Sequence, residues 1–167
     1  EVIVRKWMKS YKFIFYYRNK KNIGPEQNTK YVLNKPNSSY VWLLGDSSKI
    51  NKKTLHGVLN QIKKNFHLIL LNDKGRVSDV KTQIITNKDY LMSKVGWNMS
   101  QISSMIYSKR NLKNVNYKRF LGTRFSPTGI ALEYLANLEK ISVKWNKELT
   151  IEALKINGVE KISWQNI

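Results

Sequence analysis

The stretch Arg119 to Leu138, RFLGTRFSPTGIALEYLANL, joins a basic, glycine-containing loop to the clearest helix start in the sequence. Ser126 has the side-chain oxygen that an N-cap uses, and Pro127 suits the first helical position, where its missing N–H is not needed. Apolar residues then recur at helical spacing, at Ile130, Tyr134, Leu135 and Leu138. The stretch therefore predicts a helix capped by Ser126 that buries one apolar stripe.

Three cations, Lys118, Arg119 and Arg124, precede this helix, and Gly122 between them allows close approach to the backbone. The first turn of a helix has free amides and the positive end of the helix dipole. Together these groups predict an anion site. In a chain this basic we expect the anion to be a phosphate of nucleic acid.

The charge of the whole chain indicates the same kind of partner. Its 167 residues include 30 Lys and Arg against 11 Asp and Glu, a net charge of +19 with a pI of about 10.1. An excess of this size favours a polyanionic partner, with nucleic acid first and an anionic membrane surface a distant second. The chain has no cysteine, which excludes disulfides and thiolate metal sites. It begins at Glu1 rather than Met, which leaves open a preceding leader.

The amino-acid usage hints at origin. The chain has 24 Lys but 6 Arg, together with 18 Asn, 16 Ile and 3 Ala. Lys, Asn and Ile have AT-rich codons, so the composition favours an AT-rich genome such as that of an organelle.

Residues 1–18 interleave aromatic and basic side chains, which predicts an RNA-binding arm in which rings stack on bases and cations meet phosphates. An edge strand over YKFIFYY (11–17) is an equal alternative. A membrane-surface segment ranks third, because the sequence shows no long amphipathic helix. Residues 19–36 are predicted to form a loop, from their Asn, Lys, Gly and Pro content.

The next residues predict a strand at Tyr40 to Leu44 and a helix from an N-cap at Thr54 to Ile62. Residues 1–66 carry 14 basic and 3 acidic side chains, the densest positive charge in the chain. We therefore expect residues 1–65 to form a basic N-terminal extension with one strand and one helix. Residues 66–167 would form the α/β domain.

That domain is predicted to begin with a hairpin. FHLILL (66–71) reads as a strand, Asn-Asp-Lys-Gly (72–75) as its turn and residues 76–85 as the returning strand. Residues 87–108 then read as one broken helix or two short ones, within an insertion at about 86–117. After the Ser126 helix we expect a strand at 141–145, a helix at 147–157 capped by Gly158, and a last strand at 159–167. This order is typical of an α/β fold with a mixed sheet.

The segment from Tyr90 to Leu132 has no acidic residue and accumulates cations up to the helix start. A charge run without acids is better explained by a polyanion site than by a solvated face. The residues predicted to bind RNA are Lys109, Arg110, Lys113, Lys118, Arg119, Gly122, Thr123, Arg124 and Ser126.

Catalytic groups are not evident. His56 and His67 are the only histidines, and a lone histidine is usually structural. Asp73, Asp79 and Asp89 are too dispersed to predict a metal-binding nuclease centre. We expect a protein that is not an enzyme, with no catalytic residues, metal, cofactor or small-molecule substrate.

Three segments stand out together: the loop RFLGTRFSPT (119–128), the predicted hairpin HLILLNDKGRV (67–77) and the end ELTIEALKINGVEKISWQNI (148–167). In their order and spacing they resemble the universal small-subunit ribosomal protein number eleven family. Its loop has the form G-F-x-G-[ST]-R-K-[ST] and opens a helix. The resemblance covers roughly residues 66–84 and 119–167. The family's Gly-Pro-rich turn before the last helix is replaced by Asn146-Lys147, and its Pro-His-Asn-Gly-Cys-Arg-Pro tail is missing.

The resemblance implies an RNase H-like ribosomal protein fold, with a hairpin followed by helix, strand, helix and strand. It implies a structural protein that binds rRNA at the platform of the small ribosomal subunit and contacts neighbouring ribosomal proteins, without a membrane. The extra segments and the composition indicate a divergent mitochondrial member. The alternatives are an rRNA binder like large-subunit ribosomal protein number eighteen, and a nucleic-acid-processing factor on an RNase H-like fold.

Overall fold

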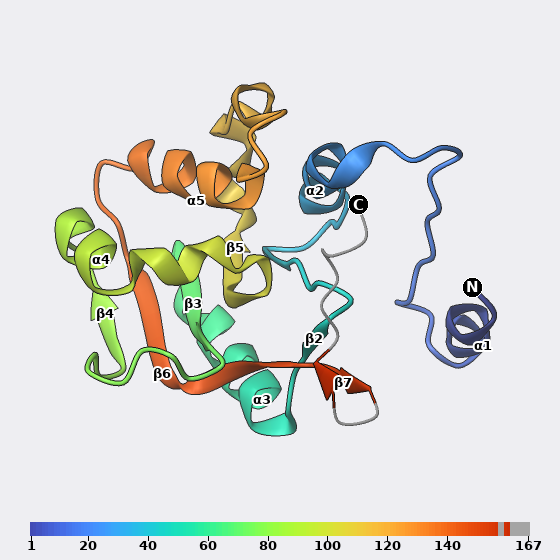
Figure 1. The fold of residues 1–167 in the computed structure, drawn as a ribbon, viewed down its shortest axis with the longest axis horizontal. Helices are drawn as coiled ribbons and strands as arrows, with labels where there is room; N and C mark the ends of the chain where they lie inside the picture. Colours follow the sequence, from blue (N-terminus) through green and yellow to red (C-terminus); the bar gives the residue numbers. More distant parts are fainter. Residues whose placement is uncertain (157–158, 161–167) are drawn as a thin grey trace.

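The computed structural model describes residues 1–156 and 159–160 and shows helices packed around one curled, mixed sheet (Figure 1). Its central strand is β3 (Leu68–Asp73), in which each of the four residues from Leu68 to Leu71 is 0% exposed. β3 pairs in parallel with β6 (Val143–Ala153) and antiparallel with β5 (Met105–Ser108). The predicted α/β class with a mixed sheet is confirmed.

Shorter strands complete the sheet. β1 (Tyr40–Trp42) pairs with the outer side of β5, β4 (Gln83–Ile85) with the start of β6, and β2 (Ser48–Lys49) with the end of β6. A separate two-stranded sheet joins β7 (Lys155–Ile156) and β8 (Val159–Glu160).

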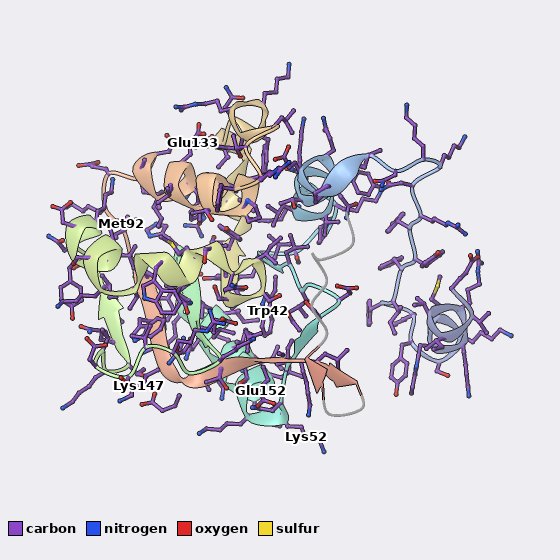
Figure 2. All side chains as sticks on the ribbon, in the orientation of Figure 1. Trp42, Lys52, Met92, Glu133, Lys147 and Glu152 are labelled. Carbon is purple, nitrogen blue, oxygen red and sulfur yellow. The ribbon has the colours of Figure 1, made fainter. Side chains whose placement is uncertain are left out.

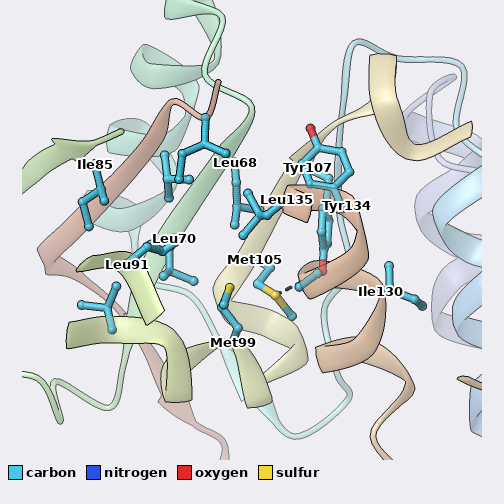
Figure 3. Close-up of a cluster of buried hydrophobic side chains, with 14 of the residues drawn as sticks. Leu68, Leu70, Ile85, Leu91, Met99, Met105, Tyr107, Ile130, Tyr134 and Leu135 are labelled. Carbon is cyan, nitrogen blue, oxygen red and sulfur yellow. Dashed lines mark hydrogen bonds between the residues drawn. The ribbon is translucent and has the colours of Figure 1, made fainter. Parts of the chain in front are cut away.

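Helices cover both faces of the sheet. Successive side chains of β3 point to opposite sides, so its run of apolar residues makes both faces apolar. Leu68 and Leu70 belong to a core with α4 (Lys88–Val95) and α5 (Ser126–Ala136), drawn in Figure 3. Ile69 and Leu71 pack on the other face, against Val58 of α3 (Lys52–Gln61). The result is a three-layer arrangement of helices, sheet and helix.

The predicted helix that begins at Ser126 forms as α5, and its stripe is buried at Ile130, Tyr134 and Leu135. Leu138, the last residue of the predicted stripe, lies beyond the end of α5 and is half-buried against the same core. The Tyr134 hydroxyl lies 2.7 Å from the carbonyl oxygen of His67 and 3.0 Å from that of Ser108. It thereby fastens α5 to the ends of the two central strands.

Two helices start at asparagines. The Asn51 side chain accepts a bond from the N–H of Thr54 at 2.8 Å, and that of Asn87 accepts one from Tyr90 at 2.7 Å. The predicted helix at 54–62 therefore exists, but Thr54 is not its N-cap. The 3-10 helices are η1 (Ile62–Lys64), η2 (Gly96–Ser100), η3 (Ile102–Ser104), η4 (Lys109–Asn114) and η5 (Tyr117–Phe120).

The predicted hairpin is wrong. The turn forms, with positive φ at Lys74 (50°) and Gly75 (66°), but β4 pairs with β6 instead of returning along β3. The side chain of Asn72 explains the difference. It donates to the carbonyl of Val77 at 2.9 Å and accepts from the N–H of Val77 at 3.1 Å, which closes the loop locally. The place beside β3 is then taken by β6.

The predicted helix at 147–157 is also wrong, because β6 continues as a strand to Ala153. Its second half pairs in parallel with Asn72 and Asp73 after a register shift. Leu149, which suggested a helical stripe, packs instead against Gly57 of α3, where an added Cβ would come within 2.5 Å of its Cδ1. Val159–Glu160 is a strand, as predicted; Gly158 and residues 161–167 lie outside the described part of the chain.

The N-terminal region differs most from expectation. The predicted loop at 19–36 contains α2 (Gly24–Asn34), which starts with Pro25 in its first turn and inserts Leu33, 1% exposed, into the core. The alternative of an edge strand at 11–17 is wrong, and residues 2–10 form α1 (Val2–Ser10).

The sheet takes strands from both sides of the predicted boundary after residue 65. β1, from the predicted extension, pairs with β5, and β5 comes from the predicted insertion at 86–117. The insertion thus supplies a strand beside β3 as well as α4, which forms where a broken helix was expected.

Candidate nucleic-acid interface

The predicted RNA-binding residues lie along one continuous segment, from η4 through η5 and a loop to the start of α5. In this segment, which we call the basic loop (residues 109–125), Arg110, Lys113, Lys118, Arg119 and Arg124 have exposed side chains. Gly122 and Arg124 take positive φ angles of 81° and 61°, so the backbone turns sharply twice before α5. The loop therefore presents five cations to solvent on a tightly folded backbone.

The loop is held together by Thr123. Its hydroxyl donates to the carbonyl of Phe120 at 2.8 Å and accepts from the N–H of Phe125 at 3.2 Å. Phe120 packs over Gly129, where an added Cβ would lie 2.3 Å from the ring. Gly129 thus explains how the loop can fold back onto α5, and the hydroxyl of Thr123 is already engaged within the protein.

The backbone N–H groups before α5, which we expected to bind a phosphate, already bind an anion. The Glu26 carboxylate, from α2, accepts bonds from the N–H of Gly122 and, at 2.9 Å, from that of Arg124. The prediction of an anion site is correct in its chemistry, since the turn does bind a carboxylate. Its occupant is a residue of the same chain, which leaves the cationic side chains as the groups available to RNA.

Glu133, labelled in Figure 2, is a second internal anion of this region. From α5 it accepts a bond from the N–H of Asn116 at 3.2 Å and lies 3.8 Å from the guanidinium of Arg119. Glu26 and Glu133 were both missed by the sequence reasoning. The Gly24-Pro25 pair before Glu26, read there as a loop signal, is also a helix start and would have placed Glu26 in a first turn.

Two predicted contact residues are used inside the protein. Ser126 is 2% exposed and is the first residue of α5 rather than its N-cap, which is Phe125. Lys109 is half-buried, and its ammonium group donates to the carbonyls of Asn34, at 3.2 Å, and Pro36. Lys109 therefore closes the carboxyl end of α2, where a cation is favourable.

Arg110 is exposed, and its charge acts on His67, which is half-buried just before β3. Burial first, and then the charge of Arg110, lowers the pKa of His67. The Nδ1 of His67 accepts a bond from the N–H of Ser142 at 3.0 Å, which requires the neutral ring. His67 thus has the structural role expected from the sequence, tying the start of β3 to the residues before β6.

Across the described residues, every Lys and Arg of known exposure is exposed or half-buried. Among these residues we find no group of three or more His, Asp and Glu side chains placed to hold a metal ion. In the same part of the chain, no helix has the length and apolar character needed to cross a bilayer.

Comparison with known proteins adds no identification, since neither a family model nor a curated protein matches the chain.

Proposed function

We propose that this chain is a non-enzymatic RNA-binding protein and that the basic loop is its main contact with RNA. The observation that carries the proposal is the projection of five cations from one ordered segment while the nearby carboxylates, Glu26 and Glu133, bind its backbone amides. Carboxylates used in this way order the loop. The ammonium and guanidinium groups remain on the outside, including that of Arg119, which stays exposed while it lies 3.8 Å from Glu133. Such a surface binds phosphates through charge and the release of counterions.

Within that class, we propose rRNA of a mitochondrial small ribosomal subunit as the partner, together with neighbouring ribosomal proteins. One support is the resemblance of residues 119–145 to the small-subunit ribosomal protein number eleven family, because the order of loop, helix and strand is kept. The other is the use of residues with AT-rich codons. The RNase H-like form of the sheet is part of this proposal. The missing hairpin and the strand in place of the closing helix are departures from it.

The proposal is tested by fractionating the tagged full-length protein from its own cells on a density gradient. We expect it to sediment with small ribosomal subunits and to be released by high salt, because the contact is electrostatic. Sedimentation only as a free protein would contradict the ribosomal assignment. Binding of the purified protein to structured RNA in vitro then decides whether the broader RNA-binding proposal stands.

A further inference from the structure

Residues 1–18, which we call the arm, form an amphipathic unit at the edge of the α/β fold, which it meets where the Lys35 ammonium lies 4.2 Å from the centre of the Tyr17 ring. On α1, Ile3, Val4, Trp7 and Met8 follow the spacing that places side chains on one helix face. The basic residues Arg5, Lys6 and Lys9 lie on the other face. Figure 1 shows α1 standing apart from the sheet and its covering helices.

The rest of the arm folds back along α1. The guanidinium of Arg5 lies 5.6 Å from the centre of the Tyr16 ring, and that of Arg18 lies 3.4 Å from the Glu1 carboxylate. Burial alternates along the returning segment, with Ile14 and Tyr16 half-buried between exposed neighbours. The arm is thus a small ordered unit of a helix and an extended segment.

The apolar surface of the arm is large for its size. Phe13 is 79% exposed and Val2 is 83% exposed, so these side chains contribute almost nothing to folding. The exposed large apolar side chains of the arm are Val2, Ile3, Trp7, Tyr11, Phe13, Phe15 and Tyr17. An apolar surface on this scale, edged by charge, marks a contact with a partner.

We propose that the arm binds the surface of an anionic lipid membrane, with its aromatic and aliphatic side chains in the interfacial layer and its cations on the headgroups. The charge of the arm indicates an anionic partner, because residues 1–18 have five basic side chains and one acidic side chain, Glu1. An apolar helix face with Trp, opposite a Lys and Arg face, is the pattern of helices that lie in a membrane interface.

Two other occupants fit less well. Val2, Ile3 and Val4 have no ring to stack on a base, although they make up much of the helix's apolar surface. A second copy of the chain would bring two strongly positive arms together. The membrane contact is independent of the basic loop and adds to RNA binding a means of holding the protein at a bilayer.

The test is co-sedimentation of the full-length protein with vesicles of phosphatidylcholine alone or mixed with phosphatidylserine. We expect binding to the anionic vesicles only. The double variant Trp7→Ser, Phe15→Ser should weaken that binding by about tenfold or more, because both side chains lose their place in the interface. Lys6→Glu with Lys9→Glu should weaken it by at least about fivefold per residue, since near-surface cations are attracted to anionic lipid.

Leu59→Ser is the control, because Leu59 is an exposed apolar residue on α3, outside the arm. It should leave vesicle binding unchanged, and the thermal midpoints of the arm variants should match that of the parent. Failure of the parent to bind anionic vesicles would overturn the proposal. So would arm variants that bind vesicles normally, or that lose RNA binding while vesicle binding is unchanged. RNA binding that is absent, or that changes in the basic loop do not weaken, would instead refute the proposed function and leave this result intact.

Discussion

β3 and the arm are both rich in large apolar residues, and the fold uses them in opposite ways. From Leu68 to Leu71 every side chain is enclosed on both faces of the sheet, whereas all residues of the arm are exposed or half-buried. Burial of apolar surface stabilises a fold by roughly 25 cal/mol per Å². In β3 that free energy is gained on folding, and in the arm it is held back until a partner binds. Apolar content alone therefore does not distinguish a core strand from a docking segment.

The largest expected difference between β3 and the arm is in stability, and a matched pair of truncations measures it. Leu70→Ala leaves a cavity between the sheet and α4, and should lower the free energy of unfolding by about 2–5 kcal/mol. Phe15→Ala should change it by less than about 0.5 kcal/mol, because the ring is exposed. Denaturant unfolding measures both. Equal effects would show that the arm is part of the cooperative core.

The next effect concerns charge in the basic loop. Arg124→Glu should weaken RNA binding by about 1–3 kcal/mol through loss of charge-assisted bonds to phosphate. Its thermal midpoint should be nearly that of the parent, since the side chain is exposed and the backbone turn is unchanged. Lys81→Glu, on the exposed loop before β4, makes the same change of charge and is the control. If both variants bind RNA alike, net charge rather than the loop determines binding.

Glu26 allows the internal anion to be tested separately. Glu26→Gln removes the charged acceptor of the Gly122 and Arg124 amides and should lower the free energy of unfolding by roughly 0.5–1.5 kcal/mol. The loop at 121–125 should also be cut faster in limited proteolysis. Glu139→Gln removes an exposed carboxylate at the end of the α5 region and should change neither measurement. An unchanged cleavage rate in Glu26→Gln would show that the carboxylate does not order the loop.

The smallest expected effect is the pH dependence contributed by His67. Its pKa is lowered in the folded protein, so the unfolded state binds the proton more readily. Stability should therefore be unaffected well above the ordinary value of 6.5 and fall modestly as the pH drops below it. His67→Asn keeps an acceptor for the N–H of Ser142 and should remove this part of the pH dependence in thermal melts. A parent and variant with identical pH profiles would contradict the assignment.

The sequence predicted correctly those elements whose apolar residues are buried on the expected face. The stripe of α5 and the run of β3 are of this kind, since both are buried as expected. The pattern failed where a polar side chain or a distant strand decided the outcome. Asn72 closes a loop that would otherwise continue a hairpin, and the pairing of β6 with β3 turns a helical pattern at 147–153 into strand.

In the candidate site, too, local residue types predicted some features and distant residues decided others. The accumulation of exposed cations followed from residue types alone, and the structure keeps five of them on the surface. The internal use of Lys109 and of the loop amides depends on α2, which lies far away in sequence. Ser126 is buried as the first residue of α5. No local pattern around residue 122 indicates that Glu26 binds there.

The most direct test of the account is the salt dependence of RNA binding by the full-length protein. If the five cations of the basic loop each meet a phosphate, affinity for a structured RNA should fall roughly 10²–10³-fold between about 50 and 200 mM salt. The slope of the log–log plot should become shallower by about one for each loop cation removed. An affinity that barely changes over this range would contradict the claim that the basic loop binds RNA through its charge.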